Sequence, residues 1–198
     1  LRRERPDDRI VALAGNPNVG KSTVFNALTG LHQHTGNWAG KTVASAVGTT
    51  VCCGETILLA DLPGTYSLRA RSAEEAVARD FLCFAKPDAA VVVCDATCLE
   101  RGLLLVMQVL ETCPKALLCV NLLDEAEKRH ITIDLPRLEQ CLGIPVVGVA
   151  ARSGKGLAQL QERLHALLHE DAPSPCPVPI PEQLEEPLQL VQAALPKN

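Results

Sequence analysis

The sequence lacks any hydrophobic run long enough to cross a membrane. Its apolar stretches, such as AAVVV at 89–93 and ALLCV at 116–120, are only five or six residues long, whereas a spanning helix needs about 20. The N-terminal segment LRRERPDDR is charged and lacks the apolar segment of a signal peptide, so we expect neither a signal nor a transit peptide. The chain is therefore expected to be soluble.

A concentration of positive charge is also missing. The 19 Lys and Arg residues are outnumbered by 23 Asp and Glu, which gives a formal net charge of -4. Nucleic-acid-binding proteins normally carry a basic stripe, so this composition argues against a nucleic-acid partner. Binding of small anionic ligands is still compatible with this charge, because backbone amides at a helix N-terminus can bind them.

The nine cysteines include no pair with C-x-x-C spacing. Five of them fall within apolar segments, where a free thiol behaves as a small hydrophobic residue. Buried free thiols in a reducing compartment are therefore favoured over disulfides or a metal site. These five are Cys52, Cys83, Cys94, Cys119 and Cys141.

Short apolar runs alternate with segments of helical period. Strands are expected at 10–15, 56–62, 89–96, 116–122 and 145–150, and helical spacing of apolar residues occurs at 103–110 and 156–170. Two strand-like runs in 44–59 meet at Cys53-Gly54 with no room for a helix, which predicts an antiparallel edge hairpin. The expected fold class is α/β, a mostly parallel six-stranded sheet with one antiparallel edge strand and helices on both faces.

Three regions are expected along the chain. Residues 1–9 form a charged tail, and 10–170 form one domain. The run DAPSPCPVPIPEQ after Glu170 holds five prolines, which indicates an extended linker. Residues 182–195 have the pattern of a weak amphipathic helix, so 171–198 is expected to be a linker and the start of a further, truncated domain.

The segment GNPNVGKS at 15–22 follows the first expected strand and opens a helix. This is the P-loop pattern G-x-x-x-x-G-K-[ST], in which backbone amides surround phosphates, the lysine contacts the β and γ phosphates, and the hydroxyl ligates Mg²⁺. The alternative is a chance match in a glycine-containing turn. Because of its role, the lysine is expected to be exposed. The candidate nucleotide-binding residues here are Gly15, Asn16, Pro17, Asn18, Val19, Gly20, Lys21, Ser22 and Thr23.

Three further segments follow at strand ends, where open α/β sheets bind ligands. In DLPG at 61–64, Asp61 is expected to hold Mg²⁺ through water and Gly64 to reach the γ-phosphate. NLLD at 121–124 matches the guanine-reading pattern N-K-x-D, with Leu122 in the lysine position; the alternative is a polar loop start. The expected base-site residues are Asn121, Leu122 and Asp124, followed in the closing loop by Ala150, Ala151 and Arg152.

With these segments in this order, residues 9–169 resemble the small GTPases of the translation-factor-like class, which use the P-loop GTPase fold. Within that class they resemble the N-terminal G domain of the FeoB ferrous iron transporters. The matching segments are GNPNVGKSTVFNALTG, GNWAGKTV, DLPGTYSL, DATCLERGLLL and NLLDEAEKRHITID.

The resemblance implies further roles. GNWAG at 36–40 would lie in the first switch, Thr42 would complete the Mg²⁺ shell, and Trp38 would be a mobile aromatic over the nucleotide, or else a residue packed on the P-loop. Asn18 would ligate K⁺, the alternative being an ordinary turn residue. The chain departs from the family at Lys41, Ala44 and Ala150, which replace the usual Val, Glu and Ser.

Thr65 stands where many GTPases place a water-orienting Gln. Hydrolysis is therefore expected to be slow and to depend on backbone positioning by Gly64 and Thr65, on Thr42, and on positive charge from Lys21, Mg²⁺ and K⁺. Arg69 and Arg71 are candidate arginine fingers, although solvated switch residues are the simpler interpretation.

The resemblance also implies partners: GTP or GDP, the helical and membrane domains that follow in FeoB, and small Feo accessory proteins, at the cytoplasmic face of a bacterial inner membrane. The sequence shows no iron-binding pattern. Two alternatives are a ribosome-assembly or RNA-modification GTPase, which usually carries an N-K-x-D lysine and a basic module, and a non-catalytic GTP/GDP switch.

Overall fold

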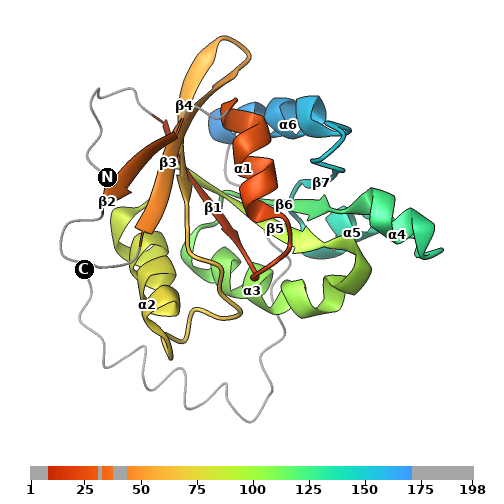
Figure 1. Cartoon of the computed structure of the whole chain (residues 1–198), viewed down its shortest axis with the longest axis horizontal. Coiled ribbons are helices and arrows are strands. Elements are labelled where there is room, and N and C mark those ends of the chain that lie inside the picture. The colour runs from red at the N-terminus through yellow and green to blue at the C-terminus, as the bar shows by residue number, and fades with distance from the viewer. Residues whose placement is uncertain (1–8, 31–32, 38–43, 171–198) are drawn as a thin grey trace.

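The computed structural model describes residues 9–30, 33–37 and 44–170, and these form a seven-stranded sheet with helices on both sides (Figure 1). The strand order is β2-β3-β4-β1-β5-β6-β7. The strands are β1 (Arg9–Gly15), β2 (Gln33–Asn37), β3 (Ala44–Cys52), β4 (Glu55–Asp61), β5 (Ala89–Asp95), β6 (Ala116–Asn121) and β7 (Val146–Gly148).

The pairing confirms the expected α/β class. Strands β4, β1, β5, β6 and β7 are parallel, and β3 is antiparallel to β4. The sheet has one strand more than expected, because β2 pairs antiparallel with β3 and takes the edge position. Its sequence QHTGN has no apolar residue, so no hydrophobic pattern indicated a strand there.

The predicted hairpin is confirmed at the junction of β3 and β4. Register pairs Cys52 with Glu55 across a two-residue loop. Both loop residues have positive φ, 50° at Cys53 and 86° at Gly54. A type I′ turn requires this conformation, and its twist suits antiparallel strands.

Helices connect the strands. The α-helices are α1 (Lys21–Thr29), α2 (Ala73–Asp80), α3 (Leu99–Thr112), α4 (Leu123–Lys128), α5 (Leu135–Leu142) and α6 (Leu157–His169). A π-helical turn, η1 (Phe81–Ala85), extends α2, and a 3₁₀ turn, η2 (Ala96–Cys98), precedes α3. Among the described helices, none combines the length and the apolar character needed to pass through a membrane.

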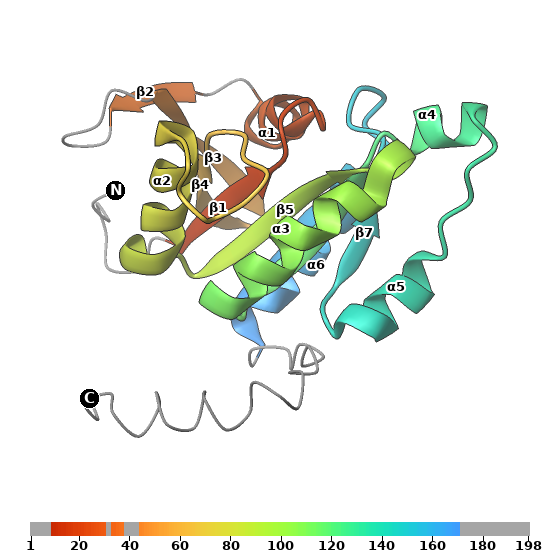
Figure 2. The ribbon, with the colours of Figure 1, turned by 90° about the horizontal axis from the view of Figure 1, so that it is seen from below.

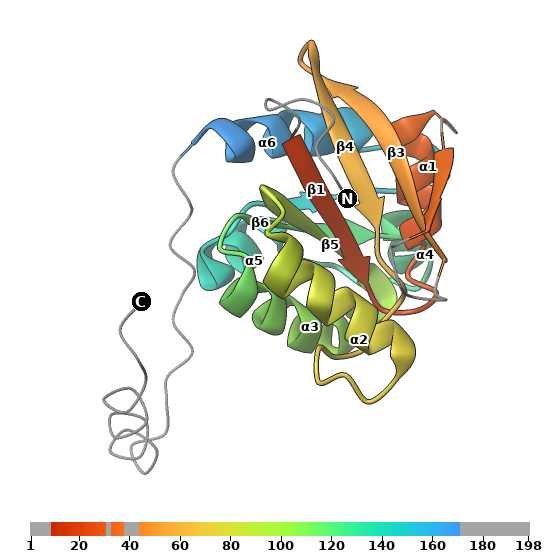
Figure 3. The same cartoon turned by 90° about the vertical axis from the view of Figure 1, so that its left-hand side faces the viewer.

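The helices form two layers with the sheet between them (Figures 2 and 3). Alternate residues of β1 point to opposite faces: Ile10, Ala12 and Ala14 join one core with α2, α3 and α5, while Val11 and Leu13 join the other core with α1 and α6. Burial on both faces explains why each inner strand is a continuous apolar run.

The expected free thiols are found at eight described cysteines, of which Cys52, Cys94, Cys113 and Cys119 are buried. The expectation of burial is wrong for Cys141, which is exposed. Its helix α5 lies at the end of the sheet and has no buried residue. The expected tail before residue 9 and the expected linker after 170 lie outside the described residues.

Candidate functional site

The P-loop segment joins β1 to α1, as its pattern predicts. Asn18 and Gly20 take positive φ values of 67° and 78°, which bends the chain into a loop ahead of the helix. The loop borders a cavity of about 490 Å³, whose lining also includes Gly64 from the DLPG segment. The cavity is lined by Asn16, Pro17, Asn18, Gly20, Lys21, Ser22, Thr23 and Gly64.

Lys21 lies at the start of α1 and its ammonium forms an ion pair with the Asp61 carboxylate at the end of β4. The expectation that this lysine is exposed is wrong, since the residue is 9% exposed. Burial raises the pKa of Asp61, and the Lys21 charge offsets this only in part. The pair thus holds two desolvated opposite charges at the base of the P-loop.

The DLPG segment is fixed to the P-loop by backbone contacts. The Leu62 amide donates to the Leu13 carbonyl at 3.0 Å, and the Thr65 amide donates to the Gly15 carbonyl at 3.1 Å. Gly64 packs so closely on Pro17 that an added Cβ would lie 3.2 Å from the Pro17 Cα. A side chain at this position would therefore push the two loops apart.

Thr65 is buried and its hydroxyl is used within a local turn. The hydroxyl donates to the Ser67 carbonyl at 2.7 Å and accepts from the Ser67 amide at 3.2 Å. The following segment is held to α3 by the Leu68 amide, which donates to Gln108 Oε1 at 2.7 Å. Arg69 and Arg71 are both exposed beyond this anchor.

Asn121 joins the P-loop to the closing loop. Its Nδ2 donates to the Val19 carbonyl at 3.0 Å, and its Oδ1 accepts from the Ala151 amide at 3.1 Å. The side chain is 1% exposed, so these bonds are shielded from water. An added Cβ at Gly20 would collide with the Asn121 amide, which explains the glycine. Asn121 therefore positions both loops.

Leu122 and Asp124 lie at the start of α4. Leu122 has a positive φ of 64° and ends the strand-to-helix turn. Asp124 follows in the first helical turn and is half-buried. The Leu123 amide donates to the Val149 carbonyl at 3.2 Å, so this turn lies directly beside the closing loop.

In the closing loop, Ala150 and Ala151 are buried and Arg152 is exposed. The Ala150 amide donates to the Lys155 carbonyl at 3.0 Å. The amide of Ala151, an expected base-site residue, donates to Asn121 Oδ1. This arrangement therefore gives Ala151 a role in holding the closing loop against Asn121.

Asn16 and Arg101 form a contact that the sequence did not indicate. Asn16 Nδ2 donates to the Arg101 carbonyl at 3.2 Å. Its Oδ1 is buried and has no hydrogen-bond partner within the described part of the chain. The Arg101 guanidinium lies 4.6 Å from the centre of the Tyr66 ring. These contacts connect the P-loop and the DLPG segment to the first turn of α3.

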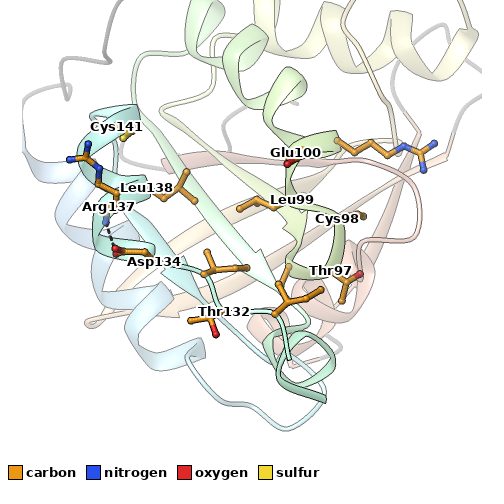
Figure 4. Close-up of a pocket in the computed structure, with 13 residues that line it drawn as sticks. Thr97, Cys98, Leu99, Glu100, Thr132, Asp134, Arg137, Leu138 and Cys141 are labelled. Atoms are coloured by element: carbon orange, nitrogen blue, oxygen red, sulfur yellow. Dashed lines mark hydrogen bonds between the residues drawn. The ribbon is translucent and has the colours of Figure 1, made fainter. Parts of the chain in front are cut away.

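A larger hollow of about 730 Å³ lies away from these motifs, between the start of α3 and α5. Figure 4 shows Leu99 and Glu100 on one side of it and Asp134, Arg137 and Leu138 on the other. The Arg137 amide donates to Asp134 Oδ1 at 2.9 Å, which caps α5. None of the P-loop, DLPG or NLLD residues lines this hollow.

The residues expected in the first switch are mostly outside the part of the chain that the structure describes. Thr42, Trp38 and Lys41 lie outside it, and Ala44 is the first residue of β3.

A family model described as ferrous iron transport protein B matches residues 9–164. The chain is 42% identical over 161 residues to the Fe(2+) transport protein A/Fe(2+) transporter FeoB fusion protein of Porphyromonas gingivalis, covering 81% of this chain and 19% of that protein. It is 41% identical over 155 residues to the Fe(2+) transporter FeoB of Salmonella typhimurium, covering 76% and 20% respectively. The chain thus spans about a fifth of the length of these relatives.

Solved structures agree with this match. The G domain of the T. maritima FeoB iron transporter has a TM-score of 0.76 at 43% identity, covering 80% of this chain and 98% of that one. The cytosolic domain of the same protein in its GMPPNP form has a TM-score of 0.89 at 39% identity, covering 93% and 73%. The expected P-loop GTPase fold is therefore confirmed.

Proposed function

Because the chain belongs to the FeoB family of ferrous iron transport proteins, we propose that it binds GTP and GDP and hydrolyses GTP slowly. The observation that carries this proposal is that Lys21 and Gly64 both line the cavity of the P-loop, and that Lys21 pairs there with Asp61. Support also comes from the T. maritima relative, whose cytosolic domain was solved in GDP and GMPPNP forms.

The residues at the cavity suit a Mg²⁺-bound triphosphate. The Ser22 hydroxyl is exposed at the cavity and would ligate Mg²⁺, and Asp61 would hold it through water, with Thr42 completing the shell. When bound, Mg²⁺ supplies charge that offsets the β and γ phosphates. Lys21 would exchange its contact with Asp61 for one with the phosphates. Asp61 would then face Mg²⁺ and its water in place of Lys21.

Guanine is recognised, in this proposal, by Asp124. A carboxylate accepts hydrogen bonds from the two neighbouring donors of guanine, whereas adenine offers no such pair. Asn121 and Leu122 place this carboxylate at the start of α4, and Asn121 also fixes the closing loop beside it. The Arg152 segment then covers the base.

Hydrolysis depends on positioning rather than on a side-chain base. The Thr65 hydroxyl is occupied by Ser67, so the neighbouring Gly64 backbone is the element that faces the cavity. Asn18 is exposed on the cavity wall, where its carboxamide would ligate K⁺. When bound, K⁺ supplies positive charge where charge develops during phosphoryl transfer.

The deciding experiment is phosphate release from Mg²⁺-GTP by the unmodified chain and by Lys21→Ala, each in K⁺ and in Na⁺. The proposal expects release by the unmodified chain that is faster in K⁺, and none by the variant. Tight GTP binding without phosphate release in either salt would instead support a non-catalytic GTP/GDP switch.

At the level of the whole protein, we propose a role in ferrous iron uptake. The relatives are Fe(2+) transporters, and this chain would be their cytoplasmic nucleotide-binding part, followed by helical and membrane domains. Fusion of Fe(2+) transport protein A to FeoB in P. gingivalis supports a small Feo accessory protein as a partner. Iron uptake by a FeoB-deficient strain carrying the full-length gene, with and without Lys21→Ala, tests this role.

A further inference from the structure

Two histidines and a glutamate meet at the end of the sheet opposite the P-loop. His165 and His169 are four residues apart in α6, which places them on one helix face. Glu55 is the first residue of β4, whereas Asp61 of the nucleotide site is the last residue of the same strand. One ligand atom of each side chain lies within 4.8 Å of the other two.

From this juxtaposition we infer that Glu55, His165 and His169 form a binding site for one divalent transition-metal ion. Glu55 Oε2 lies 2.7 Å from His169 Nε2 and 3.6 Å from His165 Nε2. Ligand atoms about 2.0 to 2.2 Å from a tetrahedral Zn²⁺ lie about 3.3 to 3.5 Å apart. The two separations from Glu55 bracket this value, and the ligand atoms of the two histidines lie within 4.8 Å of each other, so modest side-chain movements bring all three atoms to an ion.

The surroundings support this assignment. The imidazole rings are tilted at 44° with centroids 4.5 Å apart, so they are neighbours but do not stack face to face. Arg9 Nε lies 3.8 Å from Glu55 Oε1, the oxygen that does not face the histidines. Arg9 thereby helps to orient the carboxylate from behind, as partners of metal ligands commonly do.

The donor set defines the class of ion. Two imidazoles and one carboxylate suit Zn²⁺ and Fe²⁺, whereas Mg²⁺ prefers oxygen ligands alone. The side chains of the three residues are only partly exposed, at 29% for Glu55, 30% for His165 and 45% for His169. An ion would keep water molecules in its remaining coordination positions. It would also join α6 to the β3–β4 hairpin, on which this helix packs (Figure 3).

The test is a calorimetric titration of the nucleotide-free chain with Zn²⁺, after removal of bound metal and alkylation of exposed thiols. Alkylation matters because Cys53, Cys98 and Cys141 are exposed and thiolates also bind Zn²⁺. We expect one ion per chain, and we expect His165→Ala and His169→Ala each to weaken binding about tenfold or more.

The matched control is His130→Ala, which removes an exposed histidine from the turn after α4. This variant should bind Zn²⁺ as the unmodified chain does. Glu55→Gln can still hydrogen-bond to His169 but lacks the charge, so weaker Zn²⁺ binding by this variant separates a metal site from a simple hydrogen-bonded contact. Circular dichroism and melting curves without metal establish that each variant is folded.

Three outcomes would overturn the inference: unchanged Zn²⁺ affinity in both His165→Ala and His169→Ala, an equal loss in His130→Ala, or displacement of Zn²⁺ by an equimolar amount of Mg²⁺. A rise in melting temperature on adding Zn²⁺, present in the unmodified chain and absent in His165→Ala, would support it independently.

Discussion

Lys21 and Asp61, forty positions apart in the chain, form a largely buried ion pair at the base of the P-loop. Their side chains are 10% and 14% exposed. Removing one member of such a pair leaves the other desolvated and unpaired, which costs more than removing both. The two residues proposed to contact phosphate and Mg²⁺ are thus also coupled in the protein's stability.

Lys21→Ala should lower the free energy of unfolding of the nucleotide-free chain by about 3 kcal/mol, because it leaves the Asp61 carboxylate buried without its partner. Urea unfolding measures this loss. The double variant Lys21→Ala/Asp61→Ala should be more stable than Lys21→Ala alone. Equal stability of Lys21→Ala and the unmodified chain would show that the pair does not form in solution.

Asp124→Asn should weaken GTP binding about 10- to 150-fold, which corresponds to about 1.5 to 3 kcal/mol for one charge-assisted hydrogen bond. Xanthosine triphosphate should bind better than before, because its 2-carbonyl accepts from the new amide. Equilibrium binding of both nucleotides provides the measurement. Glu125→Gln is the neighbouring control, since Glu125 pairs with Lys128 on the surface; retention of normal GTP affinity by Asp124→Asn would refute base reading by Asp124.

Asn121→Ala should lower both stability and affinity, because it removes two buried hydrogen bonds that join the P-loop to the closing loop. The expected loss in the free energy of unfolding is about 1 to 3 kcal/mol. If Asn121 positions the loops, the ratio of GTP to xanthosine triphosphate affinity should stay constant. A changed ratio would mean that Asn121 itself contacts the base.

Asn18→Gly should lose most of the K⁺ stimulation of GTP hydrolysis while still binding nucleotide. Glycine adopts the positive φ of 67° found at Asn18 without strain, so the substitution removes the carboxamide and keeps the loop conformation. Phosphate release in K⁺ and in Na⁺ is the assay. Full K⁺ stimulation in this variant would leave Asn18 as a turn residue.

Alkaline pH should destabilise the fold through its buried thiols. Burial raises the pKa of Cys94 to about 12 and that of Cys113 to about 11, from an ordinary value of 9.0. Below pH 9 these thiols are protonated in both the folded and the unfolded chain. Above pH 9 the thiols of the unfolded chain lose their protons first, so the free energy of unfolding falls as the pH rises from about 9 toward 11. Urea midpoints across this range should fall less in Cys94→Ala.

The same burial predicts which thiols react. Cys53 and Cys141 are exposed and should be alkylated by iodoacetamide in the native protein, whereas Cys94 and Cys119 are buried and should react only after unfolding. Peptide mass spectrometry after a short exposure identifies the labelled positions. Rapid labelling of Cys119 in native protein would contradict its place in the core.

The sequence by itself determined the strands and the order of the motifs. Strands such as β5 and β6 are buried on both faces, and their continuous apolar runs are visible without a structure. The P-loop pattern likewise depends on near neighbours in the chain. The short polar strand β2 was missed because its sequence has no hydrophobic period, and its place is set by pairing with β3.

Tertiary structure decided how the motifs contact one another. The parallel register of β1 with β4 brings Leu13 beside Asp61, and that register buries Lys21 where the sequence predicted exposure. Asn121 reaches Val19 across 102 positions, and His169 reaches Glu55 across 114. Such pairs leave no periodic signal in the sequence. The packing of the strands and helices decides which side chains meet at the end of a sheet.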